Sequence, residues 1–267
     1  MKLLYLGTED RSEPFEEHFE EISFHKVSHT TPEVLDGETR VSLPEETVKK
    51  FDAAFVDIPK TNAVFGRVLL ELLEEENLGL NQSSTAFFTA AKKNYLSYIL
   101  KQKNIPSPDT AVIATEKASR NIEKQLSGPL IAKRYEELQE SEKKRLDTVE
   151  EIQGFAEGSE YEEDILIFQE FDSGKKIKCL VLNDRVVSLQ DNSEEWNFKK
   201  DSLQYTNISE DKKKIALDAA NALGAPIVEI TLRGEKVFDM EPFPDLELYQ
   251  ELSGKTVYQK VAEILKE

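Results

Sequence analysis

Three carboxylates near the C-terminal end of the chain are spaced so that they suit a divalent cation. They are Glu229, Asp239 and Glu241, within the stretch PIVEITLRGEKVFDMEPFPDLE. This stretch predicts a β-hairpin, because two runs suited to strands flank a turn that contains a glycine. The predicted strands are 227–232 and 236–241, and the predicted turn is 233–235. Because side chains alternate along a strand, this register places all three acids on one face, with Glu229 directly across from Asp239.

Like charges placed opposite each other destabilise a sheet, and a cation between them removes the repulsion. Mg²⁺ suits such a site because it prefers oxygen ligands and usually takes one or two carboxylates together with substrate phosphates. The same stretch is also compatible with a solvated hairpin whose acids face water, because the chain holds 52 Asp and Glu residues. The other motifs of the chain must therefore decide between a metal site and a solvated face.

The composition restricts the class of protein and its partners. A formal net charge of −18 argues against nucleic acid and against anionic membrane surfaces as partners. The single cysteine, Cys179, excludes an internal disulfide and a cysteine-based zinc site, and its apolar neighbours favour a core residue over a nucleophile. There is neither a signal core nor an apolar run of the ~18–20 residues that span a bilayer. We expect a soluble cytoplasmic protein, and a homo-oligomer is compatible with this composition.

Strand and helix patterns alternate in the first part of the chain, which is typical of a parallel α/β sheet of Rossmann-like type. The expected strands are 3–7, 22–27 and 51–57, the expected helices are 13–21 and 64–75, and 28–45 is expected to be a loop. No Gly-x-Gly-x-x-Gly follows the first strand, so the pattern does not indicate a dinucleotide site.

The rest of the chain mixes strands and helices in a different order. The expected helices are 83–102, 116–126, 149–155, 211–223 and 256–265, and the expected strands are 110–114, 130–133, 164–171, 176–182 and 185–190. Gly224 is expected to end the helix that precedes it. The charged segment 134–150 is expected to be a mobile loop or a solvated helix.

The order of several short motifs resembles the ATP-grasp superfamily, most closely its small glutamate-ligase-like branch, whose members add glutamate to a ribosomal protein or to cofactors. The resemblance covers residues 51–254. Its motifs are Asn81-Gln82-Ser83 with Ala91-Lys92, Asn104-Ile105-Pro106-Ser107-Pro108-Asp109-Thr110, Pro129-Leu130-Ile131-Ala132-Lys133, Gln169-Glu170-Phe171, the strand 174–181, Asp239-Met240-Glu241-Pro242-Phe243-Pro244-Asp245-Leu246, and Ser253-Gly254. Each motif is weak alone, and their order and spacing carry the resemblance.

The resemblance implies an ATP-grasp architecture of the α/β class, with an α+β C-terminal part. The implied divisions are a Rossmann-like pre-ATP-grasp domain at 1–82, a linking helix and segment at 83–110, a small lid subdomain at 111–171, and a C-terminal mixed-sheet domain at 172–267. The hairpin with the three acids belongs to the last of these.

The resemblance also implies that the chain binds ATP and Mg²⁺, with Mn²⁺ as an alternative ion. The implied nucleotide ligands are Lys92 and Lys133 at the phosphates, Gln169, Glu170 and Phe171 at the adenine hinge, and Lys176 at the ribose side. The implied metal ligands are Glu229, Asp239 and Glu241, and the implied catalytic cations are Lys178, Lys199 and Lys200. We expect the other helix lysines, Lys93 and Lys101, to be surface charges.

The implied chemistry joins a small-molecule or peptide carboxylate to an amine acceptor through an acylphosphate. Two other functions stay open: a degenerate member that binds nucleotide, metal or a partner without ligation, and phosphoryl transfer on the same fold. The segment 134–147 distinguishes them, because relatives carry a glycine-rich phosphate loop there. This chain has no glycine in that segment, and it has five acidic against four basic residues. If the basic residues of 134–147 lie over the site, the segment favours catalysis. If the segment is an acidic helix directed away from the site, it favours the degenerate function.

Further departures lie around the site. Asp239 and Glu241 stand where relatives carry Glu and Asn, Ala91 replaces an Asp before the helix lysine, and Lys176 replaces an Asp at the ribose side. Replacing a neutral amide by Glu241 makes this metal motif more acidic than that of its relatives.

Overall fold

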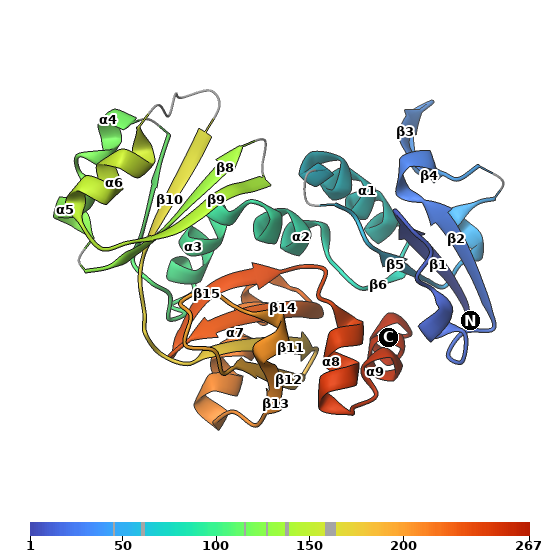
Figure 1. The fold of residues 1–267 in the computed structure, drawn as a ribbon. Coiled ribbons are helices and arrows are strands. Elements are labelled where there is room, and N and C mark those ends of the chain that lie inside the picture. The colour runs from blue at the N-terminus through green and yellow to red at the C-terminus, as the bar shows by residue number, and fades with distance from the viewer. Residues whose placement is uncertain (45, 60–61, 115, 127, 137–138, 158–163) are drawn as a thin grey trace.

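The computed structural model describes the chain except for residues 45, 60–61, 115, 127, 137–138 and 158–163. The described residues form three larger sheets and a two-stranded hairpin, arranged as N-terminal, small central and C-terminal parts (Figure 1). The first sheet is parallel and the other two are antiparallel. This mixed α/β architecture confirms the predicted fold class.

The N-terminal sheet is parallel, as its alternating patterns predicted, with the strand order β2-β1-β5-β6. Its elements are β1 (Lys2–Gly7), β2 (Glu21–Lys26), β5 (Ala53–Val56), β6 (Gly79–Leu80) and the covering helix α1 (Ala63–Glu75). The fully buried Leu4 and Leu6 of β1 pack with Leu69 and Leu73 of α1. This apolar layer fixes the helix on one face of the sheet.

The predicted helix at 13–21 was wrong. The segment contains only the 3-10 turn η1 (Glu13–Phe15), and β2 already begins at Glu21. The reason is packing, because Phe15 is 1% exposed and its ring lies against Tyr5 and Tyr258. Tertiary contacts therefore outweigh the helix propensity of the surrounding glutamates. Other 3-10 turns are η2 (Val27–His29), η3 (Val48–Lys50) and η5 (Lys200–Ser202).

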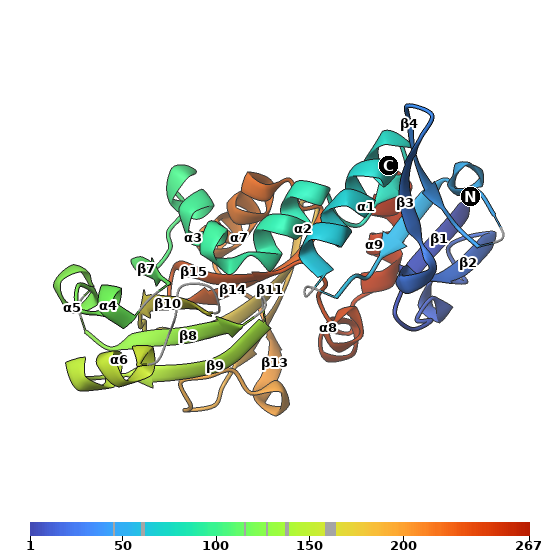
Figure 2. The same ribbon diagram turned by 90° about the horizontal axis from the view of Figure 1, so that it is seen from above.

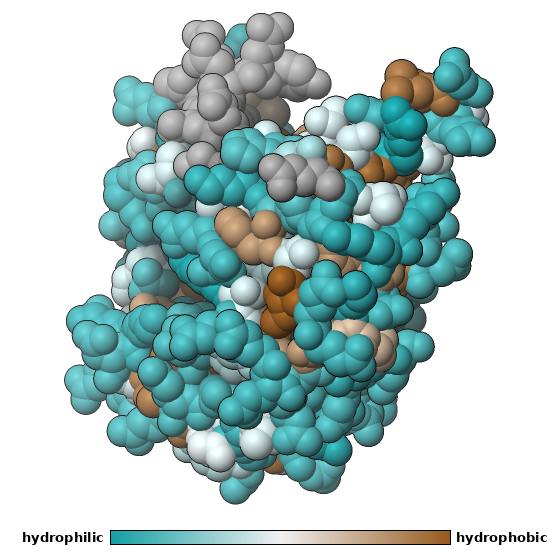
Figure 3. All heavy atoms as spheres, turned by 90° about the vertical axis from the view of Figure 1, so that its right-hand side faces the viewer, coloured by the Kyte–Doolittle hydropathy of each residue, from teal (hydrophilic) through white to brown (hydrophobic). Residues whose placement is uncertain are grey.

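The predicted loop at 28–45 was also wrong, because part of it forms a hairpin of β3 (Thr31–Leu35) and β4 (Glu38–Ser42). Asp36 and Gly37 at its tip have positive φ angles of 54° and 83°. An Asp-Gly pair suits the two-residue hairpin turn, because both of its central residues need positive φ angles. The hairpin projects from the molecule, and the face on this side is mostly hydrophilic (Figure 3).

The linking segment contains two helices where the pattern predicted one. They are α2 (Ser84–Ala91) and α3 (Lys93–Gln102). Ser83 caps the first helix, and its Oγ accepts a hydrogen bond from the Ala86 amide at 3.1 Å. Lys92 interrupts the helix with φ −95° and ψ 80°, and this break brings Lys93 to the C-terminal hairpin.

The small sheet is antiparallel, with the strand order β7-β10-β8-β9. Its elements are β7 (Thr110–Ile113), β8 (Leu130–Glu136), β9 (Gln139–Leu146), β10 (Asp164–Glu170), α4 (Glu116–Ser119), α5 (Ile122–Gln125) and α6 (Val149–Ala156). The predicted helix at 116–126 is therefore two short helices. Seen from above, β8 and β9 extend toward the C-terminal sheet (Figure 2).

The prediction of a loop or solvated helix at 134–150 was wrong, because residues 134–136 belong to β8 and residues 139–146 form strand β9. It pairs with β8 through Leu130 with Leu146, and through Lys133 with Lys143. The buried Leu130 and Leu146 belong to the apolar core on one face of the sheet, which leaves Lys133 and Lys143 on the other. The many charges conceal this period of two, since only one face of the hairpin is apolar.

The C-terminal sheet has the strand order β13-β12-β11-β14-β15 and is antiparallel. Its elements are β11 (Lys176–Leu182), β12 (Arg185–Asp191), β13 (Leu203–Thr206), β14 (Ile227–Arg233), β15 (Lys236–Glu241), α7 (Glu210–Leu223), α8 (Leu246–Ser253) and α9 (Val257–Leu265). Gly224 ends α7 with φ 66°, as predicted.

The two faces of this sheet have different partners. Cys179 is buried with the alanines of α7 and α2 on one face. Leu180 and Tyr249 belong to a second core that also includes Leu3 of the N-terminal sheet. Helices α8 and α9 thus join the N-terminal and C-terminal sheets (Figure 1). No helix in the described part of the chain has the length and apolar content needed to cross a bilayer.

The hairpin exists where the sequence predicted it, but the predicted pairing of Glu229 with Asp239 was wrong. Glu229 pairs with Glu241, and Thr231 pairs with Asp239. The register shifts between Thr231 and Leu232, because a bulge inserts one extra residue and Arg233 belongs to the strand rather than the turn. The three acids still share one face, since Glu229 and Thr231 are two residues apart on the same strand.

Candidate active site between the small and C-terminal sheets

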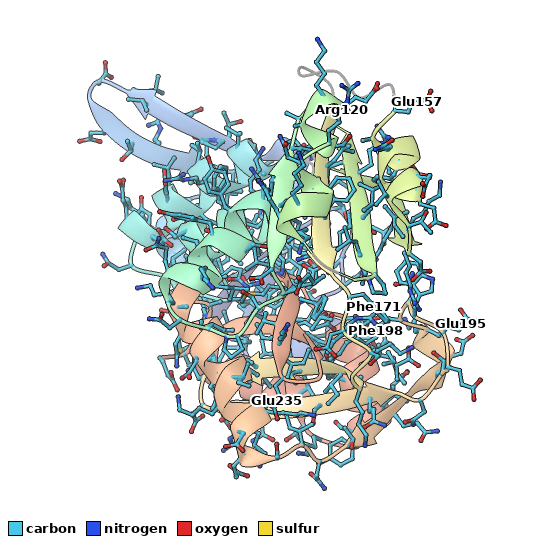
Figure 4. The ribbon with its side chains drawn as sticks, turned by 90° about the vertical axis from the view of Figure 1, so that its left-hand side faces the viewer. Arg120, Glu157, Phe171, Glu195, Phe198 and Glu235 are labelled. Atoms are coloured by element: carbon cyan, nitrogen blue, oxygen red, sulfur yellow. The ribbon has the colours of Figure 1, made fainter. Side chains whose placement is uncertain are left out.

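A cleft of about 190 Å³ lies between the small sheet and the C-terminal sheet. The residues that line it include Ile131, Lys133, Lys143 and Gln169 on the small sheet, and Lys178, Glu229, Thr231, Arg233, Asp239 and Glu241 on the C-terminal sheet. Phe198 also lines it, and Figure 4 shows this ring close to Phe171 where the two parts meet. The cleft therefore brings together predicted nucleotide, catalytic and metal residues from separate elements.

Glu229 is buried on the floor of this cleft and has two polar partners. Its Oε1 accepts a hydrogen bond from Lys178 Nζ at 2.6 Å, and its Oε2 accepts one from the Tyr249 hydroxyl at 3.0 Å. Burial, with the nearby Glu229 charge, raises the pKa of Tyr249 well above its ordinary value. Tyr249 therefore stays a donor, and the carboxylate of Glu229 is held in place.

Asp239 is bonded to a lysine that the sequence patterns assigned to the surface. Lys93 Nζ donates to Asp239 Oδ1 at 2.5 Å and also to the Met240 carbonyl oxygen. Burial lowers the pKa of Lys93, but Asp239 and Glu241 outweigh burial and the net shift is upward. The prediction that Lys93 is a surface charge was wrong, whereas Lys101 is exposed as predicted.

Lys92, the predicted phosphate ligand, lies at the helix break outside the residues that line the cleft. Its Nζ is 5.9 Å from the centre of the Phe88 ring, and burial lowers its pKa. Its predicted role stays a prediction. The neighbouring Lys93 is the linking-segment lysine that contacts a cleft carboxylate, because the break at Lys92 changes which side chain faces the hairpin.

Lys133 and Lys143 lie opposite each other on β8 and β9 and face the cleft together. Lys133 is 5% exposed, and its Nζ lies 4.0 Å from Asp239 Oδ2. Lys143 Nζ donates to Asn197 Oδ1 at 3.2 Å. Burial, together with the charge of Lys133, lowers the pKa of Lys143. Two adjacent ammonium groups with this environment favour a polyanionic ligand.

The predicted adenine hinge follows these lysines. Its backbone amides at Glu170 and Phe171 donate to the carbonyl oxygens of Asp109 and Pro129, at 3.0 and 2.8 Å. The Phe171 ring has Arg145 at 4.5 Å and Arg233 at 5.5 Å from its centre. Planar guanidinium groups beside an aromatic ring form a surface suited to a stacked base.

Gln169 is the first residue of the predicted hinge and lines the cleft. It is 4% exposed, and its Oε1 has no hydrogen-bond partner among the described residues. Buried amide oxygens are normally bonded, so this atom is available to a ligand that donates a hydrogen bond.

Lys176 forms an ion pair with Asp191 and hydrogen bonds to the loop that follows β12. Its Nζ lies 2.7 Å from Asp191 Oδ2, and donates to Ser193 Oγ at 2.8 Å and to the Asn197 carbonyl oxygen at 3.0 Å. Burial raises the pKa of Asp191, but hydrogen bonds led by that from Lys176 reverse this effect and bring it to about 2. Lys176 therefore fixes the loop that carries Asn197, a residue lining the cleft.

Lys199 and Lys200 are exposed and lie outside the residues that line the cleft. Lys199 is paired with Glu195, and Lys200 Nζ is 2.9 Å from Asp245 Oδ2. The structure thus brings Lys178 into the cleft and leaves the other two predicted catalytic lysines on the surface, where their role stays a prediction.

The cleft also contains residues that the sequence patterns did not assign to the site. Arg233 belongs to the predicted turn 233–235, and Phe198 lies outside every motif of the family resemblance. Lys143 was considered only as one member of a charged segment. Arg233 enters the cleft because the bulge extends β14 to include it, and Lys143 because it pairs with Lys133 on the face of β9 opposite the apolar core. Phe198 reaches the cleft from the loop between β12 and η5, whose position depends on long-range contacts.

The carboxylate oxygens in the cleft suit a metal ion whose remaining ligands come from substrate phosphates. Among residues the structure describes, no three acidic, histidine or cysteine side chains converge as a metal cage. Asp239 and Glu241 supply hard oxygen donors on one face, while Glu229 is bonded to Lys178 and Tyr249. Mg²⁺ usually takes one or two carboxylates plus phosphates, so the residues present fit it.

Sequence comparison agrees with this arrangement. A model of the RimK-like ATP-grasp domain matches residues 90–265, more than half of the chain. The chain belongs to the RimK-like ATP-grasp family. A comparison with curated proteins finds no match.

Solved structures of ATP-grasp ligases share the fold of this RimK-like protein. The ligase PsnB, complexed with minimal precursor, Mg and ADP, has a TM-score of 0.73 at 13% identity and covers 98% of this chain and 96% of its own. The macrocyclase MdnC from Microcystis aeruginosa, bound to its precursor peptide, has a TM-score of 0.72 at 11% identity, with 99% of each chain covered. The D-alanine–D-alanine ligase of Bacillus anthracis, complexed with ATP, has a TM-score of 0.68 at 14% identity and covers 99% and 95%.

Proposed function

We propose that this protein is an ATP- and Mg²⁺-dependent ligase that joins a carboxylate to an amine. The observation that carries the proposal is the cleft, where buried lysines from two strands and the linking segment face carboxylates of the C-terminal hairpin. Cations on one wall suit phosphates, and acidic oxygens on the other suit a phosphate-bound metal. The cation-bearing hairpin β8–β9 also favours catalysis over the degenerate function.

We assign different roles in the proposed reaction to different residues of the chain. Lys133 and Lys143 hold the phosphates, Phe171 and Glu170 flank the base, and Gln169 Oε1 accepts a hydrogen bond from the nucleotide. Lys176 acts through the loop that it fixes, and Lys92 adds charge at the helix break. A substrate carboxylate oxygen attacks the γ-phosphorus and ADP leaves, and an amine nitrogen then attacks the acyl carbon and phosphate leaves.

Positive charge aimed at developing negative charge is the main catalytic contribution of the protein. We assign it to Lys178, whose ammonium already lies in the cleft, with Lys199 and Lys200 approaching from the rim. Asp239 and Glu241 would hold Mg²⁺, with Glu229 across the ladder as the third acid, and Mn²⁺ would serve as a substitute. When bound, the metal would neutralise charge on the transferring phosphoryl group.

The proposed substrates are a small-molecule or peptide carboxylate and an amine acceptor, in a cytoplasmic setting. The family resemblance supports this pair, and two solved neighbours carry precursor substrates of their own. The cleft of about 190 Å³ is smaller than the roughly 300–1,000 Å³ of ordinary ligand sites. Binding of ATP is therefore expected to move the small sheet away from the C-terminal sheet.

The test is calorimetric titration with ATP, with and without Mg²⁺, followed by phosphate release in pools of carboxylates and amines. We expect binding that Mg²⁺ strengthens, and turnover that Lys133→Ala and Asp239→Ala each remove. Lys101→Ala is the matched control, since this lysine is exposed on the linking helix. Failure of millimolar ATP to bind would exclude the ligase function, and unchanged turnover in both variants would mean that the site lies elsewhere.

A further inference from the structure

A second cavity, of about 900 Å³, lies between the N-terminal sheet and α8. One wall is the carboxyl end of the parallel strands β1 and β5, the position at which open parallel sheets bind ligands. Asn81 fixes this wall by exchanging two hydrogen bonds with the Val56 backbone, at 2.8 and 3.0 Å. Gln82 donates to the Pro242 carbonyl oxygen at 2.7 Å, which ties the linking segment to the opposite wall.

Six of the seven charged residues that line this cavity, which we call the acidic cleft, are carboxylates. They are Asp10, Glu13, Asp57, Asp245, Glu247 and Glu251. Arg11 is the one basic residue among the described lining residues, and its guanidinium donates to Glu9 at 3.2 Å. The acidic cleft therefore repels a carboxylate substrate and attracts a cation.

Two polar groups in the acidic cleft lack partners. Asp57 directly follows β5 and is partly buried, and its carboxylate makes neither a hydrogen bond nor a close ion pair with a described residue, although the charge of Arg11 partly offsets the effect of burial on its pKa. Tyr5 is 3% exposed, and its hydroxyl likewise has no hydrogen-bond partner among the described residues. Burial is the main reason that the pKa of each is raised. Both groups line the acidic cleft without a hydrogen-bond partner among the described residues, so they suit a ligand that donates hydrogen bonds and carries positive charge.

Aromatic rings complete this environment. Tyr5 stacks on Phe55 with ring centres 5.3 Å apart, and Phe55 also lies 5.2 Å from Phe15. All three rings line the acidic cleft. Ring faces attract organic cations, and they also contact the methylene groups between two charged ends. An aromatic and acidic lining is therefore more suited to an alkyl ammonium compound than to a bare metal ion.

The acidic cleft lies next to the proposed reaction site. Glu241 lines the cleft between the sheets, and its charge acts on Asp57 in the acidic cleft. We propose that the acidic cleft binds the amine substrate of the ligase, and that this substrate is an organic cation with a second positive charge besides the reacting amine. This inference rests on the proposed ligase function for its role in catalysis, but the binding itself needs no ATP.

Calorimetric titration without ATP, in buffer that contains Mg²⁺, tests the binding. The probes are lysine amide, norleucine amide and glutamate. The two amides share a backbone and differ in side-chain charge, whereas glutamate has a net negative charge. We expect lysine amide to bind about tenfold more tightly than norleucine amide, since a close charge pair contributes on this scale, and glutamate not to bind. The preference should weaken with added salt.

Asp57→Asn should remove most of the preference for lysine amide, and Tyr5→Phe should weaken binding by a smaller factor. Asp218→Asn, an acid on the far helix α7, is the matched control and should change neither. Thermal melts show whether each variant folds. Tight glutamate binding, no binding of any probe at millimolar concentration, or unchanged lysine amide binding in folded Asp57→Asn would each overturn the proposal. Absence of ATP turnover with intact lysine amide binding would refute the ligase function alone.

Discussion

Lys93 provides the sharpest test of the site, because its neighbour Lys92 is a matched control. Substituting methionine keeps the length and apolar stem of either side chain and removes only the ammonium. In Lys93→Met, Asp239 loses a hydrogen bond of 2.5 Å and the Met240 carbonyl loses its contact with the ammonium. Lys92 has no carboxylate partner among the described residues, and its Nζ is 5.9 Å from the Phe88 ring centre.

The magnitude follows from the burial of the pair. Removing one partner of a fully buried ion pair costs about 3–5 kcal/mol, and a charged hydrogen bond contributes about 1.5–3 kcal/mol. The Asp239 side chain is 33% exposed and Lys133 remains 4.0 Å away, so the charge is only partly uncompensated. We therefore expect Lys93→Met to lower the free energy of unfolding by about 2 kcal/mol, and Lys92→Met to change it by less than about 0.5 kcal/mol.

Urea unfolding, monitored by circular dichroism, measures both variants. A double-mutant cycle with Asp239→Asn isolates the pair, and we expect a coupling free energy of about 1–2 kcal/mol. Equal stability of the two lysine variants, or a coupling near zero, would refute the placement of Lys93 against Asp239 and the helix break that produces it.

Three further outcomes follow from buried charges and from packing. Lys143→Met should raise the melting temperature of the ligand-free protein, because burial disfavours the charged ammonium group. The same variant should weaken ATP binding at least about tenfold by calorimetry, because the phosphates lose a cation. A lower melting temperature together with unchanged ATP affinity would contradict this. Asp191 has its pKa lowered to about 2, so its stabilisation is complete above pH ~4 and is lost as the pH falls toward 2. Lys176→Met should abolish this acid transition and destabilise the fold, which pH-dependent unfolding would show; an unaltered acid transition would argue against the pair. Gly66→Ala places a methyl group against the Phe87 ring and should lower the free energy of unfolding by about 1–2 kcal/mol despite better helix propensity. A stabilised variant in urea unfolding would mean that the ring can move.

The sequence predicted the elements whose patterns depend on local chemistry. Helix α7 has its apolar period and ends at Gly224, and the hairpin β14–β15 is where its β-branched runs placed it. The errors fall where long-range contacts decide. The charged strand β9 is apolar on only one face, and residues 13–21 follow the packing of Phe15 rather than their helix propensity.

The residues of the candidate site show the same contrast between local sequence signals and long-range contacts. Residue types and order were sufficient to select Lys133, Gln169 and Asp239 as members of one cleft. They were not sufficient to choose between Lys92 and Lys93, because a helix break of one residue decides which ammonium faces the hairpin. They were also not sufficient to pair Glu229 with Glu241, because the bulge changes the register without a glycine or proline to mark it.

The extra negative charge of Glu241 in the proposed metal motif is compensated by basic side chains in the folded site. Glu241 stands where the family resemblance implies a neutral amide. Burial lowers the pKa of Lys93, but the charges of Asp239 and Glu241 outweigh burial and raise it, so that this lysine remains cationic beside them. Five basic side chains accompany three carboxylates in and beside the cleft. The basic residues are Lys93, Lys133, Lys143, Lys178 and Arg233, and the acids are Glu229, Asp239 and Glu241. The cleft therefore has a local excess of positive charge in a chain of net charge −18, and this excess suits a polyanion such as a nucleoside triphosphate. The acidic cleft on the other side of Glu241 has the opposite balance, so the two cavities are suited to substrates of opposite charge.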